Sequence, residues 1–265
     1  MNIQPLKELL LEIKKIHSIE SVLHWDQETY MPEGGGDIRA EHLAYLSSLA
    51  HKLHTGENFR SLLEKSVDMD TGKPLEPDAD QETQRLLFLT WKDFRDDSAL
   101  PADFVEELSR HEAKSQQVWA KARMENDYKT FAPYLEKMIR LKKKEAEYYG
   151  YKTTPYDSLI DKYEPGMTSE KITALFDELR EPLVRLVQKI ENSGADIDEA
   201  PLKRSFDVAK QWEFSLEVAK TMGYDFEKGR QDKSAHPFTT SFHPTDVRIT
   251  TRLKEYYFKS GIFAT

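Results

Sequence analysis

Apolar residues recur every three or four positions through most of this chain, and this spacing constrains the fold more than any other feature. It is the spacing of amphipathic helices, in which one face packs against a core. The first stripe runs from Leu6 to Leu23, and Pro32–Gly36 ends it with a proline and a run of glycines. Further stripes predict helices over residues 37–55, 59–63, 81–96, 102–122, 131–149, 168–194 and 205–222. Such a chain folds as an array of packed helices.

The pattern changes near the C-terminal end of the chain. Pro237–Phe242 and Val247–Thr251 are rich in threonine, phenylalanine, valine and isoleucine, and the residues between them are typical of a turn. This predicts a β-hairpin in an otherwise helical chain. A lone hairpin is marginally stable in water, so it must pack on helices or gain another strand. We therefore predict a mainly α fold, a multi-helix array with a small β-hairpin near the C-terminus.

The predicted elements divide into three regions that we expect to form one domain. These regions are an N-terminal helical region over residues 1–68, a helical body over residues 69–228 and a β-hairpin region over residues 229–265. A chain of this length can bury roughly 75% of its unfolded surface. The sequence contains no internal repeat and no low-complexity tract that would indicate a repeat architecture.

Charge and composition exclude several classes of partner. The net charge is −9 and no basic stripe carries interleaved aromatic residues, so we expect no nucleic-acid binding. The absence of cysteine excludes disulfides and thiolate metal sites, and it favours the cytoplasm. The first residues lack a secretory signal, and no apolar segment is long enough to cross a bilayer. We therefore expect a cytoplasmic protein without a membrane partner.

No pattern in the predicted helices indicates a metal site or a catalytic nucleophile. A zinc-binding His-Glu-x-x-His helix presents two histidines one turn apart with a glutamate as base, and this sequence contains none. His111–Ser115 holds half of that motif, with serine in place of the second histidine. His51 and His54 have a spacing that metal ligands also use, but a solvated helix face is the simpler interpretation. We assign no catalytic residue and no metal ligand.

The segment His24–Pro32 is dense in polar and aromatic groups near the end of the first predicted helix. His24 and Glu28 lie one turn apart, so they share a helix face and can pair. Asp26 could tie this helix to a neighbour by hydrogen bonds. A structural role at the helix end is our first interpretation, and a role in lining a cleft is the alternative.

The predicted hairpin carries a second group of candidate residues. His236 precedes Pro237, which cannot donate to a ladder and therefore belongs at the start or edge of a strand. An edge strand can capture an extended peptide, and His236 could then hydrogen-bond the peptide near its reacting carbonyl. Asp246 and Arg248 share one strand face, where they could pair or hold a catalytic helix. The alternative is an Asp246 that caps the turn and an Arg248 at the surface.

Three motifs of this sequence resemble those of the carboxypeptidase Taq family of metallocarboxypeptidases. They are His24-Trp25-Asp26-Gln27-Glu28-Thr29 with Met31-Pro32, then His236-Pro237-Phe238, and then Asp246-x-Arg248-x-Thr250. The segments 156–159 and 163–166 also resemble family segments. The resemblance covers essentially the whole chain, which is similar to about the N-terminal half of family members.

The resemblance implies a mostly helical fold in which this chain forms one half of a groove-forming peptidase. Family members release single amino acids from peptide C-termini and are commonly homodimers. They hold zinc or cobalt on a His-Glu-x-x-His helix together with a later glutamate. The resemblance also implies that His236 and Phe238 contact the peptide substrate, and that Asp246 and Arg248 support the metal helix.

The apolar segment Ser260–Thr265 looks like the start of a helix, and in the family the metal-binding helix begins almost immediately after the matching segment. We therefore expect an N-terminal portion of a metallocarboxypeptidase that lacks the metal site, binds no metal and is inactive by itself. Apolar surface near Ile249, Ile262 and Phe263 should then be left uncovered. The alternative is a non-catalytic helical interaction module whose motifs are relics.

Overall fold

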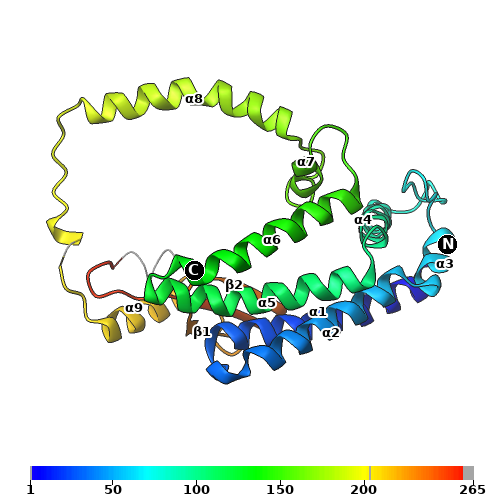
Figure 1. Ribbon diagram of the computed structural model, residues 1–265, viewed down its shortest axis with the longest axis horizontal. Helices are drawn as coiled ribbons and strands as arrows, with labels where there is room; N and C mark the ends of the chain where they lie inside the picture. Colours follow the sequence, from blue (N-terminus) through cyan, green and yellow to red (C-terminus); the bar gives the residue numbers. More distant parts are fainter. Residues whose placement is uncertain (1, 203, 259–265) are drawn as a thin grey trace.

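The predicted helical array is present in the computed structural model, which describes residues 2–202 and 204–258. Figure 1 shows long helices side by side, with a small sheet against them. The helices are α1 (Gln4–Thr29), α2 (Gly36–Thr55), α3 (Glu57–Glu64), α4 (Gln81–Ser98), α5 (Ala102–Glu125), α6 (Tyr128–Tyr149), α7 (Pro155–Ile160), α8 (Ser169–Glu191) and α9 (Val208–Thr221). The mainly α fold with a small sheet near the C-terminus is therefore confirmed.

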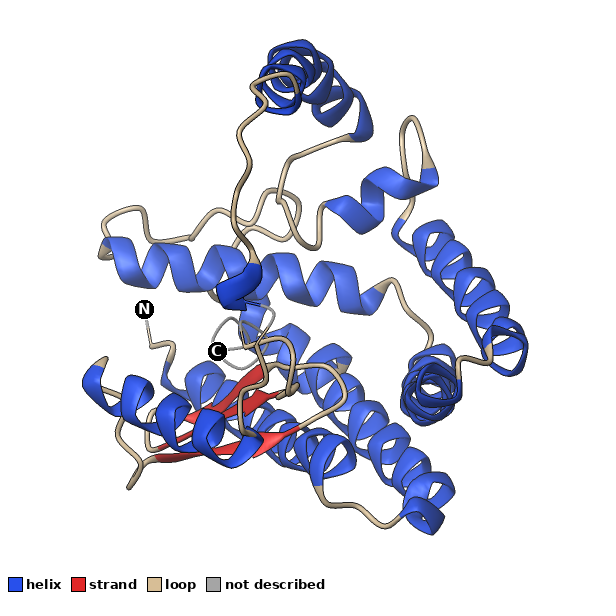
Figure 2. Ribbon diagram, turned by 90° about the vertical axis from the view of Figure 1, so that its left-hand side faces the viewer, coloured by secondary structure: helices blue, strands red, loops and turns tan. Residues whose placement is uncertain are grey.

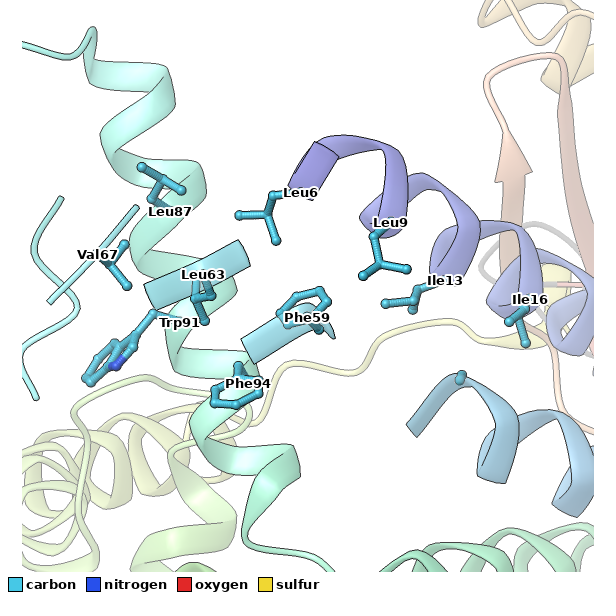
Figure 3. Close-up of a cluster of buried hydrophobic side chains, with 11 residues drawn as sticks. Leu6, Leu9, Ile13, Ile16, Phe59, Leu63, Val67, Leu87, Trp91 and Phe94 are labelled. Atoms are coloured by element: carbon cyan, nitrogen blue, oxygen red, sulfur yellow. The ribbon is translucent and has the colours of Figure 1, made fainter. Parts of the chain in front are cut away.

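The largest apolar core joins the start of α1 to α3 and α4 (Figure 3). Leucines and isoleucines of α1 meet the large side chains of the two other helices, which are Phe59, Leu63, Leu87, Trp91 and Phe94. Burial of one such side chain contributes about 1.5–3 kcal/mol to stability. This cluster therefore holds the beginning of the chain to residues that follow it by some fifty to ninety positions.

Side-chain caps set the starts of several helices. Asp80, Asp127 and Asp207 each accept a hydrogen bond from the backbone N–H three residues later, at the starts of α4, α6 and α9. The caps at Asp127 and Asp207 explain why α6 begins at residue 128 and α9 at residue 208, where apolar spacing predicted 131 and 205. Apolar spacing locates the buried face of a helix, whereas the capping side chain fixes its first residue.

The predicted solvated face at His51 and His54 is wrong. Both imidazoles are buried because the end of α4 covers this side of α2. The Asp97 carboxylate lies 2.6 Å from His54 Nδ1, and the Asp97 carbonyl accepts a hydrogen bond from His51 Nε2 at 2.9 Å. His111, from the incomplete zinc motif, is also buried and donates to the Tyr134 carbonyl at 3.0 Å. These three histidines join helices to one another.

The sheet contains the predicted hairpin and one additional strand. β2 (Thr239–His243) and β3 (Asp246–Thr251) pair antiparallel, with Thr240 opposite Arg248. β1 (Gly229–Lys233) pairs parallel with the other side of β3, so the strand order is β1-β3-β2. The hairpin thus has both of the supports that its stability requires, a further strand and packing on α1.

Helices lie against both faces of this sheet, which Figure 2 draws in red. Side chains alternate along a strand, so even-numbered and odd-numbered strand residues face opposite ways. On the even face, the Arg248 guanidinium lies 4.2 Å from the ring centroid of Trp25 in α1. On the odd face, the Gln231 amide donates to the Ser215 hydroxyl of α9 at 2.7 Å. The sheet is therefore held between α1 and α9.

The expected exposure of Ile249 is wrong. Its side chain is only 6% exposed, because β3 is the central strand and Ile249 lies on the face that α9 covers. Ile262 and Phe263, which were expected to be uncovered with it, lie outside the described residues. The same holds for the whole segment Ser260–Thr265, the expected start of a helix.

α8 stands apart from the other helices, as the yellow-green helix of Figure 1 shows. None of its residues is buried, although its sequence carries an apolar stripe at helical spacing. The exposed side chains of this α8 stripe include Leu175, Phe176, Leu179, Leu183, Leu186 and Ile190. Even so, no helix in the described part of the chain is long and apolar enough to cross a membrane.

Candidate functional site

A hollow with a volume of about 440 Å³ lies where α1 and α5 meet the segment that leads into β2. α1 contributes His24 and Glu28 to its wall, and α5 contributes Gln116 and Trp119. The remaining wall residues are His236 and Phe238, the two positions that the sequence assigns to substrate contact. The fold thus brings together two motifs that lie more than two hundred residues apart in the sequence. Of the two interpretations of His24 and Glu28, a structural role at the helix end and a role in lining a cleft, the structure shows the second.

Asp26, from the same motif, has the structural role that the sequence predicted. Its carboxylate accepts a hydrogen bond from the Arg39 guanidinium of α2 at 2.6 Å. The same guanidinium donates to the Leu23 carbonyl at 2.5 Å. Arg39 thereby joins α1 to α2 beside the hollow and fixes the end of α1 on which His24 and Glu28 lie.

The contribution of α5 was not predicted. Glu112, Gln116 and Trp119 recur at the i, i+4, i+7 spacing of one helix face, and this was the signal available in the sequence. Two further hollows continue along this face of α5. One shares Gln116 and Trp119 with the central hollow and extends toward α6, and the other shares His24 and extends along α1. The three hollows together make a trough beside α5.

Desolvation shifts the pKa of two side chains in the central hollow. Burial raises the pKa of Glu28, while a hydrogen bond from Gln116 and the proximity of His236 act in the opposite direction. Burial also lowers the pKa of His24, with partial compensation from Glu20 and Glu112. The hollow therefore contains a neutral imidazole and a carboxylate whose negative charge is only partly compensated.

One hydrogen bond fixes the tautomer of His236. Its Nδ1 lies 3.0 Å from the Pro237 carbonyl oxygen, which can only accept, so Nδ1 carries the proton. Nε2 is then the ring nitrogen left to bond a ligand. The Trp119 ring lies 6.4 Å from the His236 ring, and the Arg123 guanidinium lies 5.0 Å from the Trp119 ring centroid. Arg123 also donates to the Ala235 carbonyl, next to His236.

Asp246 and Arg248 form the pair that their alternation predicted. Two parallel hydrogen bonds of 2.9 Å join the guanidinium to the carboxylate, and Arg248 holds the pKa of Asp246 below its usual value. Arg248 is mostly buried between Trp25 and Phe242, so the surface alternative is wrong. The pair fixes the sheet against α1, whereas its support of a metal helix stays a prediction.

A second arginine repeats this arrangement on β1. The Arg230 guanidinium donates twice to the buried carboxylate of Asp232 at 2.7 Å, and the Tyr30 hydroxyl donates to the same carboxylate. Arg230 also lies 5.2 Å from the ring centroid of Trp25. Two charged pairs thus hold the end of α1, and with it Glu28, in place above the sheet.

The donor groups of the described residues do not fit a catalytic metal. Within residues 2–202 and 204–258, no three histidine, aspartate or glutamate side chains converge closely enough to hold a metal ion. The functional geometry that can be assigned is therefore a trough with a strand beside it.

We expect the two histidines of the trough in α1 to titrate on opposite sides of the ordinary imidazole value of 6.5. Burial lowers the pKa of His24, whereas a hydrogen bond to Glu20 raises the pKa of His17. In an NMR titration toward acid, the ring resonances of His17 should shift before those of His24. The reverse order would contradict the lowering of the His24 pKa by desolvation.

These two pKa shifts also determine whether each histidine raises or lowers the free energy of unfolding as the pH falls. Below pH 6.5 the unfolded chain takes up a proton at His24 more readily than the folded chain does, so His24 lowers stability as the pH falls through that range. His24→Gln should remove this loss of stability at low pH. His17→Gln should have the opposite effect, because the raised pKa of His17 adds to the free energy of unfolding at low pH.

The sequence matches a known family over nearly its whole length. A family model described as Carboxypeptidase Taq (M32) metallopeptidase matches residues 5–265. Carboxypeptidase 1 of Bacillus subtilis is 32% identical over 258 residues, which are 97% of this chain and 50% of that protein. Thermostable carboxypeptidase 1 of Thermus thermophilus is 35% identical over 272 residues, which cover 99% of this chain and 52% of that protein.

Solved structures agree with the sequence matches. A crystal structure described as BsuCP superposes with a TM-score of 0.91 at 32% identity, over 99% of this chain and 52% of that one. The M32 carboxypeptidase from Deinococcus radiodurans superposes with a TM-score of 0.79 at 34% identity, over 98% of this chain and 51% of that one. This chain thus spans about half the length of the relatives that it matches. From its motifs, its fold and these matches, we conclude that the chain belongs to the carboxypeptidase Taq (M32) family of metallopeptidases.

Proposed function

We propose that this chain forms one wall of the peptide groove of a metallocarboxypeptidase and aligns an extended peptide along β2. The observation that carries the proposal is the hollow lined by His236 and Phe238 at the start of a strand with an open edge. Family membership implies a divalent metal in the whole enzyme, and we propose zinc or cobalt by resemblance. The described residues do not form its site, so the roles proposed for this chain are confined to binding and positioning the peptide.

The register of β2 defines which backbone groups are open to a peptide. β2 has a neighbour on one side only within the described sheet. The Thr250 N–H donates to the Phe238 carbonyl at 2.9 Å, so this pair of residues is hydrogen-bonded across the ladder. In an antiparallel ladder every second pair is bonded, and Thr239 and Ser241 therefore direct their N–H and C=O groups away from β3. These outward groups can bond an added strand.

The side chains around this edge have separate proposed roles. Phe238 and Trp119 offer apolar surface to the peptide, and His236 offers Nε2 to one of its polar groups. Asp246 and Arg248 hold β3 against Trp25 and so keep the edge strand in register. By the same resemblance, we propose a homodimer as the form of the whole enzyme, and from the absence of cysteine we propose a cytoplasmic location.

We expect Thr239→Pro to weaken peptide binding roughly two- to tenfold. Proline removes the outward N–H, and one lost backbone hydrogen bond costs about 0.5–1.5 kcal/mol. The ladder keeps its bonds, because Thr239 is the first residue of β2, a position that tolerates proline. A short unlabelled peptide is titrated into the ¹⁵N-labelled protein, and the dissociation constant is read from the shifts of β2 resonances.

Thr239→Ala is the matched control for this experiment, because it removes the same side chain and keeps the N–H. It should bind the peptide as the unaltered protein does. Equal affinity for the proline and alanine variants would show that no strand is added at this edge. Failure of every peptide to bind the unaltered protein would refute the proposed function as a whole.

The exposed α8 stripe supports a second candidate, a non-catalytic helical interaction module. Such a module binds a partner through an apolar helix face and needs no open strand. The two candidates differ in what they bind, since only the groove wall requires peptide-dependent shifts at β2. The titration of β2 therefore separates them without any measurement of turnover.

A further inference from the structure

The groups that line the central hollow mostly accept hydrogen bonds. Glu28 contributes a carboxylate, and His236 contributes Nε2, since its Nδ1 proton is bonded to the Pro237 carbonyl. His24 contributes a ring whose pKa is lowered by desolvation, which favours the neutral form, in which one nitrogen accepts. A ligand with several donors on one atom would satisfy these groups together.

In the described part of the chain, the Glu28 carboxylate has no permanent cationic partner. Within the described residues no lysine or arginine forms an ion pair with it, and the hydrogen bond that it receives comes from the neutral amide of Gln116. Two arginines on neighbouring helices already have partners. Arg39 pairs with Asp26, and Arg123 lies against Trp119. A partly buried carboxylate without a cation is costly, so a cationic ligand would be stabilised here.

The remaining wall is aromatic. Trp119 and Phe238 line the same hollow as Glu28. Aromatic rings attract a cation through their electron-rich faces, and they also cover the methylene groups of a long side chain. An anionic ligand would be repelled by Glu28, and an apolar one would leave the partly buried carboxylate without a counter-charge.

We propose that this hollow binds an alkylammonium group of the peptide, with Glu28 as its counter-ion and Trp119 and Phe238 around it. The proposal rests on the peptide-binding function proposed above and names the side-chain chemistry that the groove selects. An ammonium group donates three hydrogen bonds, which matches the acceptors of Glu28, His24 and His236. Two parts of a peptide carry this group, a lysine side chain and the N-terminal amine.

Two sets of peptides distinguish the two sources. In the first set, four N-acetylated tetra-alanine peptides each carry one lysine, at a different position, and four neutral counterparts carry norleucine in its place. In the second set, a norleucine peptide with a free N-terminal amine is compared with its acetylated form. Titrations into the ¹⁵N-labelled protein are followed at the Trp119 indole N–H. We expect at least one ammonium-bearing peptide to bind about tenfold more tightly than its neutral counterpart. The peptide that does so identifies the source.

Glu28→Gln keeps the shape of the side chain and removes its charge. It should abolish the preference for ammonium, so that each ammonium-bearing peptide binds no more tightly than its neutral counterpart. The matched control is Glu125→Gln, which removes a carboxylate from an exposed position at the end of α5. This control variant should keep the full preference, which would exclude a general effect of net charge.

The outcomes separate this inference from the proposed function. If no ammonium-bearing peptide, the free-amine peptide included, binds more tightly than its neutral counterpart and Thr239→Pro weakens binding of all of them, the ammonium site is refuted and the groove wall stands. If no peptide binds, n-butylammonium is titrated alone against n-butanol. If the Trp119 indole resonance shifts with n-butylammonium but not with n-butanol, and does not shift in Glu28→Gln, the ammonium site is upheld and the strand-addition function is refuted. Absence of any such shift would refute both.

Discussion

Replacement of Phe59 by alanine is expected to lower the free energy of unfolding by about 3–5 kcal/mol. The Phe59 side chain is fully buried, and its ring packs against those of His54 and Phe94 at centroid distances of 4.5 and 5.9 Å. Alanine would leave a cavity between α1, α3 and α4, because packed helices shift too little to fill the space that the ring occupied. Urea unfolding followed by circular dichroism measures the loss.

Leu179→Ala in α8 is the control for this prediction. Leu179 is apolar like Phe59 but 53% exposed, so its removal should change the free energy of unfolding by less than about 0.5 kcal/mol. A cost of several kcal/mol at Leu179 would show that the α8 stripe is covered in solution. A cost that grows with protein concentration would identify self-association as the cover.

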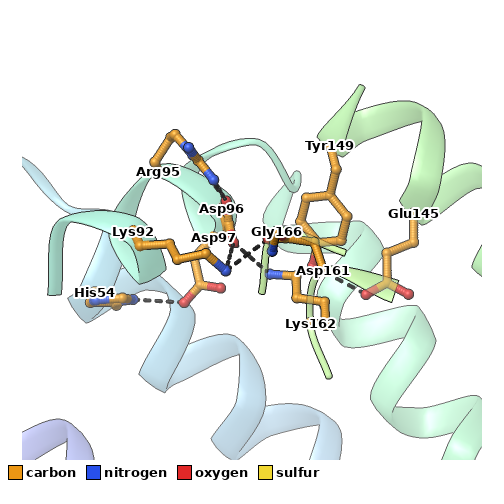
Figure 4. Close-up of polar contacts among 10 residues, drawn as sticks. All are labelled: His54, Lys92, Arg95, Asp96, Asp97, Glu145, Tyr149, Asp161, Lys162 and Gly166. Carbon is orange, nitrogen blue, oxygen red and sulfur yellow. Dashed lines mark hydrogen bonds and ion pairs between the residues drawn. The ribbon is translucent and has the colours of Figure 1, made fainter. Parts of the chain in front are cut away.

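Replacement of Asp96 by alanine is expected to cost about 2–3 kcal/mol. Figure 4 shows Asp96 at the centre of a charged cluster, with its side chain only 11% exposed. It accepts from Arg95 at 2.8 Å and from Lys162 Nζ at 3.1 Å, and Lys92 Nζ lies 3.8 Å away. Its removal leaves Arg95 and Lys162 without this counter-charge, whereas Lys92 keeps its ion pair with Asp161 at 2.9 Å. The expected cost stays below that of a fully buried pair because Lys162 remains 31% exposed.

Two further variants test the electrostatic cause of this loss. Lys162→Met in the Asp96→Ala background should recover part of the stability, because it removes a cation whose counter-charge was Asp96. Glu136→Ala should cost less than about 0.5 kcal/mol, since Glu136 pairs with Arg140 on an exposed helix face. If the double variant is no more stable than Asp96→Ala, the loss comes from packing and not from charge.

The helices could be predicted from the sequence because apolar spacing is a local property of the chain. Burial of a polar helix face is not local, and this is why His51 and His54 were misjudged. Their burial depends on Asp97, a residue more than forty positions away that supplies both hydrogen bonds. Nothing near His51 in the sequence indicates that such a partner will cover it.

β1 was missed for a related reason. Its sequence is polar, so it lacks the apolar alternation that indicates a strand. The strand forms because β3 offers an open edge, and because Gln231 and Asp232 find partners in Ser215 of α9 and in Tyr30 directly after α1. Gly229 permits a close approach, since a β-carbon there would lie 2.1 Å from the Val247 carbonyl oxygen.

The candidate site was predictable in part. His236 and Phe238 could be selected because a His-Pro step at a strand start is unusual and resembles a family motif. His24 and Glu28 were recognised as a pair on one helix face, but their position opposite His236 depends on how α1 packs on the sheet. Gln116 and Trp119 carried only a helical spacing, which most surface helices share.

The strand order has a consequence for how the protein is made. β3 is central in the sheet yet last in sequence among its strands, so neither β1 nor β2 has a strand to pair with until residue 251 has been synthesised. The ribosome adds about 5–20 residues per second, so the time between the synthesis of β1 and the completion of β3 is on the order of seconds. A growing chain on the ribosome therefore completes its N-terminal helices first, and the surface proposed to hold a peptide is among the last of the described parts to form.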